Sequence, residues 1–93
     1  MSLYQFETII IPQEKKSLLR FELMEPAKVK LRISNDQEEV RLLLNEAMHS
    51  GKHEVTFHFG ELHAGNYAAR LIVNTNNAID ITTTNIHIKP NTL

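Results

Sequence analysis

The dominant pattern in this chain is an alternation of apolar and polar residues with a period of two. Such alternation is typical of β-strands that bury one face. It is clearest over 53–59, where Val55, Phe57 and Phe59 share one side, and over 29–33. Similar segments recur about every ten residues and end at turn-forming residues. They predict strands over 6–11, 17–23, 29–33, 40–44, 53–59, 67–73 and 78–88.

Segment 38–48 has an ambiguous pattern. Its composition favours a helix, and Asp36 stands where it could cap one. The strands expected on both sides favour a strand instead, because short strands at regular spacing are typical of sandwiches. We predict a short strand that ends near Leu44, with Val40, Leu42 and Leu44 facing inward.

The last expected strand contains two apolar sets that alternate in different phases. Ile79 and Ile81 follow one phase, and Ile86 and Ile88 follow the other. We expect both sets to face the core, which requires a β-bulge in the threonine run 82–84. The sequence therefore predicts a bulge there, after a hairpin turn over 74–77.

The strands together predict an all-β fold with a single domain over residues 1–93. A chain of 93 residues can form one core between two layers. About seven antiparallel strands at this spacing indicate an Ig-like antiparallel β-sandwich with Greek-key connections. A five-stranded OB-type barrel is the alternative, and it is less favoured because the chain has too many strands and no basic, aromatic face.

Composition narrows the functional classes. Ten basic and eleven acidic residues give a formal net charge of −1, and cysteine is absent. We expect no nucleic-acid partner, since that role needs a basic face. We also expect no membrane insertion, because no apolar run approaches the ~20 residues of a membrane helix. The N-terminus lacks the features of a secretory signal, so we expect a cytoplasmic protein, or an extracellular or cell-surface one if the chain is a domain of a longer protein.

Several segments follow one another in a recognisable order. Leu-Arg-Phe-Glu-Leu at 19–23 is followed by Pro26 and by the strand 29–33, and later Ser-Gly-Lys-His at 50–53 precedes Gly65-Asn66-Tyr67. This order resembles the Ig-like domain family of flagellar hook-capping proteins and of the C-terminal sorting domains of the type IX (Por) secretion system of Bacteroidetes. The resemblance covers about 18–89, and Gly65 and Tyr67 are its most specific element.

The resemblance implies a non-enzymatic module for protein interaction, assembly or secretion sorting. The alternative is a carbohydrate- or small-ligand-binding module, which would use the cationic residues Lys28, Lys30 and Arg32 on one strand face. The simpler interpretation of these cations is a solvated outer face paired with acidic neighbours.

The histidines supply the candidates for a metal site. His58, His63 and Glu54 combine imidazole and carboxylate groups that suit zinc. His49 and His53 are four residues apart, but this spacing joins two ligands only on a helix, and a turn at 50–51 separates them. Solvated surface histidines are the expectation, with no metal-binding residues and no cofactor.

Catalytic residues are not expected either. Glu38 and Glu39 are adjacent, so in a strand their carboxylates point to opposite faces and form no acid–base pair. The serines at 17, 34 and 50 do not lie in a nucleophile elbow. The sequence also contains no phosphate-binding glycine loop and no dinucleotide fingerprint. We therefore predict that the protein is not an enzyme.

Two further residues carry specific expectations. Ile10, in a run of three isoleucines, should be exposed on an edge strand, where it favours pairing with another chain and hence a homodimer. Tyr67 should bury its ring beside Ala69, Leu71 and Val73 and direct its hydroxyl to a backbone group, as in a tyrosine corner.

Overall fold

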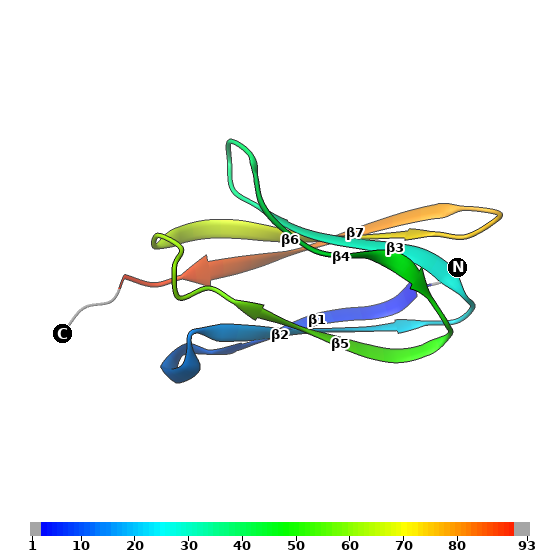
Figure 1. Ribbon diagram of the computed structural model, residues 1–93, viewed down its shortest axis with the longest axis horizontal. Helices are drawn as coiled ribbons and strands as arrows, with labels where there is room; N and C mark the ends of the chain where they lie inside the picture. Colours follow the sequence, from blue (N-terminus) through cyan, green and yellow to red (C-terminus); the bar gives the residue numbers. More distant parts are fainter. Residues whose placement is uncertain (1–2, 91–93) are drawn as a thin grey trace.

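The chain forms two antiparallel β-sheets that pack face to face (Figure 1). The computed structural model describes residues 3–90. Within them, one sheet has the strand order β1-β2-β5 and the other the order β4-β3-β6-β7. The fold is therefore the seven-stranded, all-β sandwich that the alternation predicts. The elements are β1 (Leu3–Ile11), a 3₁₀ turn (Pro12–Glu14), β2 (Lys16–Leu23), β3 (Ala27–Ser34), β4 (Glu39–Met48), β5 (Gly51–His58), β6 (Gly65–Asn74) and β7 (Ile79–Ile88).

The core lies between the sheets and is formed by alternate residues of their facing strands. The inward sets predicted for β5 and β6 are confirmed, and β2 and β3 follow the same alternation. At most 3% of each of the following residues is exposed: Leu19, Phe21, Leu23, Val29, Leu31, Ile33, Phe57, Ala69, Leu71 and Val73.

Segment 38–48 is a strand, as predicted, but β4 is longer than expected because it pairs with β3 along its whole length. The pairing contains register irregularities, so Leu44 lies opposite Leu31 while Leu42 lies opposite Arg32. One extra residue between these pairs reverses the side on which Leu42 lies. The prediction that Leu42 faces inward is wrong: it is 46% exposed, while Val40 and Leu44 pack against the core.

The predicted bulge in β7 is also wrong. The pairing of β6 with β7 runs without a shift from Gly65 opposite Ile88 to Asn74 opposite Ile79. A continuous ladder keeps all its hydrogen bonds but allows only one phase of β7 to face the core. Ile86 and Ile88 are therefore buried, and Ile79 and Ile81 lie on the outer face.

Strand β1 is an edge strand of its sheet, and Ile10 is 40% exposed, as predicted. The reason for this exposure differs from the expected one. Ile10 lies opposite the buried Ser17 and in phase with Phe6, which packs against the core. It is therefore on the inner side of β1, at the open end of the sandwich.

Tyr67 occupies the position expected from the sequence. Its side chain is 8% exposed, and its hydroxyl donates a hydrogen bond of 2.8 Å to the backbone oxygen of His63. Gly65, where β6 begins, has a φ of +149°, a region that favours glycine. The glycine and the tyrosine together determine how the chain enters β6.

Arg41 joins the two sheets on the side formed by β4 and β5. Its guanidinium donates a hydrogen bond to the backbone oxygen of His58 and lies 5.5 Å from the centroid of the Phe57 ring. This side of the sandwich is thus bridged by a polar side chain that also covers an aromatic one.

Candidate interaction surface

The outer face of the four-stranded sheet carries two groups of side chains that share one surface. Because residues alternate along each strand, those between the buried positions point away from the core. On this face a cationic stripe consists of Lys28, Lys30, Arg32 and Arg70, and an isoleucine patch consists of Ile72, Ile79 and Ile81.

The strand register makes the two groups contiguous. Arg32 of β3 lies opposite Arg70 of β6, and Lys30 lies opposite Ile72, which lies opposite Ile81 of β7. Side chains directly opposite one another on neighbouring strands have Cβ atoms about 4.5–5.5 Å apart. The cationic stripe therefore borders the isoleucine patch along β6.

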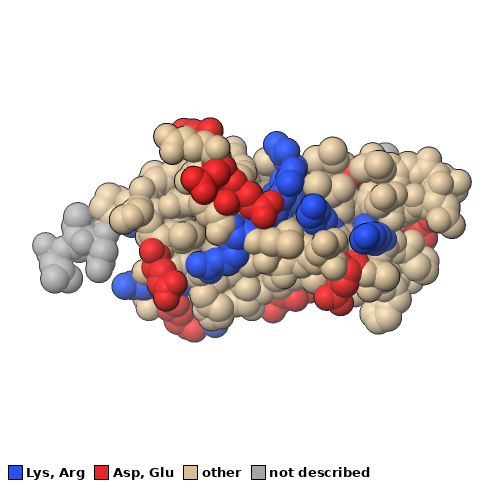
Figure 2. All heavy atoms as spheres, turned by 45° about the horizontal axis from the view of Figure 1, so that its top comes forward, with Lys and Arg blue, Asp and Glu red and all other residues tan. Residues whose placement is uncertain are grey.

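The cations of the stripe have few acidic neighbours. Arg32 forms an ion pair with Glu39, with 3.5 Å between Nη1 and Oε1, and both side chains are substantially exposed. Within the described part of the chain, no ion pair joins Lys28, Lys30 or Arg70 to a carboxylate. Figure 2 shows basic side chains gathered over the middle of this face, with acidic ones toward the β3–β4 hairpin. The stripe thus gathers four basic side chains on one face of a chain whose formal net charge is −1.

The isoleucine patch contains the most exposed large apolar side chains of the described residues. Ile79 is 61% exposed and Ile81 is 60% exposed. Both belong to β7, which is one of the two edge strands of its sheet in the described structure. An apolar edge strand has free backbone groups beside an unburied apolar surface, which favours contact with another chain.

The sequence identified part of this surface. Lys28, Lys30 and Arg32 share one face of β3, as predicted. Arg70 was not among the residues identified from the sequence, because its position opposite Arg32 depends on strand register. The alternation in 67–73 does indicate that Arg70 points outward. Ile79 and Ile81 were assigned to the core, so the patch was missed as well.

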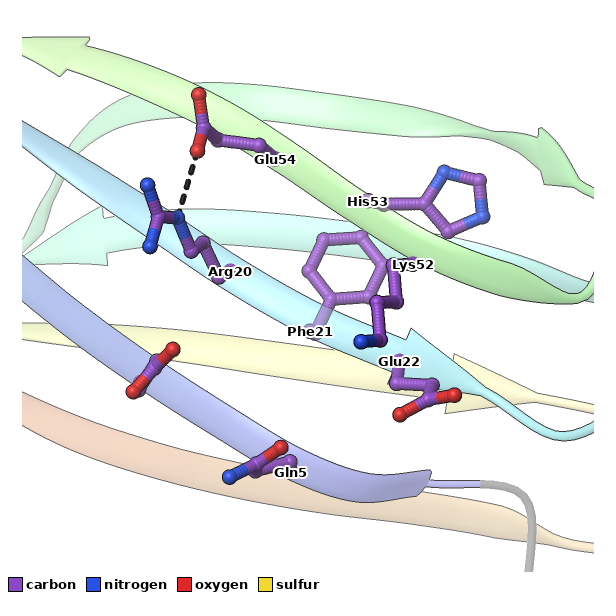
Figure 3. Close-up of a pocket in the computed structure, with 8 residues that line it drawn as sticks. Gln5, Arg20, Phe21, Glu22, Lys52, His53 and Glu54 are labelled. Atoms are coloured by element: carbon purple, nitrogen blue, oxygen red, sulfur yellow. Dashed lines mark hydrogen bonds and ion pairs between the residues drawn. The ribbon is translucent and has the colours of Figure 1, made fainter.

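The outer face of the three-stranded sheet has a different arrangement. A hollow of about 380 Å³ over this face is lined by both acidic and basic side chains (Figure 3). Arg20 lies between Glu7 and Glu54 in the strand register, and its Nε is 2.6 Å from Glu54 Oε2. Here charges of opposite sign are neighbours.

A larger hollow of about 600 Å³ lies at the open end of the sandwich. Its apolar lining comes from distant parts of the chain and includes Ile10, Phe59, Leu62 and Ile88, with His63 among its polar residues. No sequence pattern indicates such a hollow, because it forms where separate loops and strand ends meet.

The histidines are distributed over several places. The His49 and His53 rings stack with their centroids 5.4 Å apart, and His53 Nε2 is 2.8 Å from the backbone oxygen of His49. The intervening turn thus brings together two rings that the sequence led us to treat as separate. Among the described residues, no three His, Cys, Asp or Glu side chains are grouped where they could hold a metal ion. The combination of His58, His63 and Glu54 is therefore not assembled.

Glu38 and Glu39 are placed by the β3–β4 hairpin. Asn35 Oδ1 accepts hydrogen bonds from the backbone N–H groups of Gln37 and Glu38, at 2.9 and 3.0 Å. Glu38 thus belongs to the turn, whereas Glu39 begins β4 and pairs with Arg32.

Comparison with known proteins does not indicate a role for this surface. No protein-family model matches the sequence, and no curated protein matches it either. None of the helical segments in the described chain has the length and apolar character that crossing a bilayer requires. A functional interpretation therefore depends on the surface itself.

Proposed function

We propose that this protein is a non-enzymatic, Ig-like β-sandwich module that acts in protein interaction or assembly. The observation that carries the proposal is the exposure of Ile79 and Ile81 on an edge strand. Isolated apolar residues are common on protein surfaces, but these two adjoin Ile72 and a free strand edge. Binding of another protein there would remove this apolar surface from water and could pair the free backbone groups of the edge.

The Ig-like assignment rests on topology and on one corner of the fold. The chain crosses between a three-stranded and a four-stranded antiparallel sheet. At the entry to the penultimate strand, Tyr67 bonds the backbone four residues upstream, which is the arrangement of a tyrosine corner. The sequence resemblance to hook-capping and type IX sorting domains points to secretion sorting as the narrower form of the role.

Photo-crosslinking tests the proposal in cells that produce the protein naturally. A photoreactive benzoylphenylalanine replaces Ile81, and in a control it replaces Thr56, an exposed residue on the other sheet. We expect covalent adducts with a protein at position 81 and far fewer at position 56. Absence of adducts at position 81 would contradict the proposed role of this face.

Self-association through an edge strand is one form that the interaction can take. We propose a homodimer formed through β1 or β7, the edge strands on one side of the sandwich. Light scattering at micromolar concentration measures the mass of the wild type and of Ile10→Lys and Ile81→Lys, with Thr56→Lys as a control. A monomeric wild type would remove the homodimer and leave a different protein as the partner.

A second candidate function is supported by the hollow at the open end of the sandwich. A volume of about 600 Å³ is within the usual range for small-molecule sites, and its lining combines apolar groups with His63 and His87. A carbohydrate or another small ligand bound there should shift the amide resonances of Leu62 and His63, which line the hollow, rather than those of Ile79 and Ile81 at the other end of β7.

A further inference from the structure

We infer that the outer face of β3, β6 and β7 binds a protein segment in which acidic and apolar side chains lie on the same side. The inference rests on the proposed function and adds the chemistry of the partner. It follows from the charge of the cationic stripe and from its position beside the isoleucine patch. Other kinds of binding partner fit this arrangement less well.

Charge complementarity identifies the acidic part of the partner. In the described strands of this face, four cations are accompanied by one carboxylate, that of Glu39. Arg32 and Arg70 lie directly opposite each other, although like charges in such positions destabilise a sheet. Carboxylates brought by another chain would relieve this repulsion and would meet cations that have no acidic partner in the described chain.

The geometry of the face identifies the apolar part. Lys30, Ile72 and Ile81 form a row across three strands that lie about 4.8 Å apart. Along an extended segment, side chains on the same side are about 6.8 Å apart. A segment lying over this face can therefore place an apolar side chain on the patch and a carboxylate on the stripe.

A second copy of this chain fits the face less well. Two copies docked face to face about a two-fold axis would set the stripe against either the stripe or the isoleucine patch of the other copy, and neither group supplies the carboxylates that the stripe lacks. Two copies paired through their β7 edges would bring their Ile79 and Ile81 side chains side by side on one extended sheet, but would leave the stripe without carboxylates. An acidic polysaccharide or a nucleic acid could neutralise the stripe but would leave the three isoleucines uncovered. A protein segment with both acidic and apolar side chains can neutralise the stripe and cover the isoleucine patch.

The test is an NMR titration of the full, isotope-labelled chain with synthetic ten-residue peptides. The main peptide has Glu and Val alternating at the odd positions and Ser at every even position, so that Glu and Val share one side when it is extended. One matched peptide replaces Glu by Lys, a second replaces Val by Ser, and a short heparin fragment serves as a polyanion without apolar groups.

We expect the Glu–Val peptide to shift the amide resonances of β6 and β7 and to bind more weakly as salt is raised. The Lys–Val peptide should leave these resonances unchanged, and the Glu–Ser peptide and the heparin fragment should bind at least several-fold more weakly. Arg70→Gln should weaken binding by about two- to fivefold, the range for one exposed charge pair. Ile81→Ser should weaken it as well, and Lys52→Gln on the other sheet should not.

Two results would overturn the inference. One is a Glu–Val peptide that shifts no resonance on this face. The other is heparin or the Glu–Ser peptide binding as tightly as the Glu–Val peptide, which would show that the stripe recognises anions without apolar groups. Either result leaves the crosslinking test at position 81 unaffected, so the failure of this inference is distinguishable from the failure of the proposed interaction role.

Discussion

The outer faces of the two sheets are built by the same alternation but arrange their charges differently. On the three-stranded sheet, Arg20 has Glu7 and Glu54 as cross-strand neighbours, and Glu22 lies opposite Lys52. On the four-stranded sheet, the cross-strand neighbour of Arg32 on β6 is another arginine, and that of Lys30 is an isoleucine. The first arrangement neutralises charge within the face, and the second leaves it available.

The apolar residues of the two faces differ in the same sense. Ile9 and Leu18 lie opposite each other on the three-stranded sheet and are half-buried. Ile79 and Ile81 on the four-stranded sheet are about 60% exposed. Cross-strand neighbours rather than overall composition therefore distinguish the face whose apolar residues are half-buried from the face on which the proposed partner would bind.

The largest expected effect lies on the inner side of β6, behind the proposed interaction surface. Tyr67→Ala should reduce the free energy of unfolding by about 3–5 kcal/mol, because it removes a buried aromatic ring. Tyr67→Phe should cost about 1 kcal/mol, the net value of the hydrogen bond to His63. Denaturant unfolding measures both variants. A loss below about 1 kcal/mol for Tyr67→Ala would show that the two sides of β6 differ less than the structure indicates.

An intermediate effect is expected on the outer face of the three-stranded sheet. Leu18→Ser should cost about 1 kcal/mol, since a half-buried leucine loses part of the 1.5–3 kcal/mol of full burial. The matched change on the other sheet is Ile81→Ser, whose side chain is 60% exposed. Equal losses for the two variants would contradict the difference in apolar exposure between the faces.

Replacing Arg20 and replacing Arg70 should change the free energy of unfolding in opposite directions. Arg20→Ala should destabilise the fold by up to about 0.5 kcal/mol, a value reduced for solvent screening because Arg20 and Glu54 are each 46% exposed. Arg70→Ala should be neutral or slightly stabilising, because it removes the repulsion from Arg32. Thermal unfolding at low and high salt checks this, and the difference should shrink as salt is raised.

The smallest stability change is expected for the isoleucine patch itself. Changing Ile79 and Ile81 together to Ser should alter the free energy of unfolding by no more than about 0.5 kcal/mol, as for other exposed positions. The same variant should increase solubility, measured by the protein concentration at which precipitation begins. A large loss of stability would mean that these side chains support the fold rather than a partner.

Most of the fold could be predicted from the sequence because the decisive signal is local. Alternation and turn residues located every strand of the described chain, and they identified Phe57, Leu71 and the other core residues of β5 and β6. The bond of the Tyr67 hydroxyl was also predictable, since a glycine, a tyrosine and a strand start lie within three residues.

The candidate surface depended more on tertiary structure. In β4 and β7, apolar residues occur in both phases, so alternation alone cannot decide which phase faces the core. That choice belongs to strand register: an extra residue turned Leu42 outward, and an unbroken ladder did the same for Ile81. The sequence by itself determined that Lys28, Lys30 and Arg32 share a face. Only the pairing of distant strands placed Arg70 and the isoleucines beside them, because hydrogen-bonded registers join residues that are far apart in the chain.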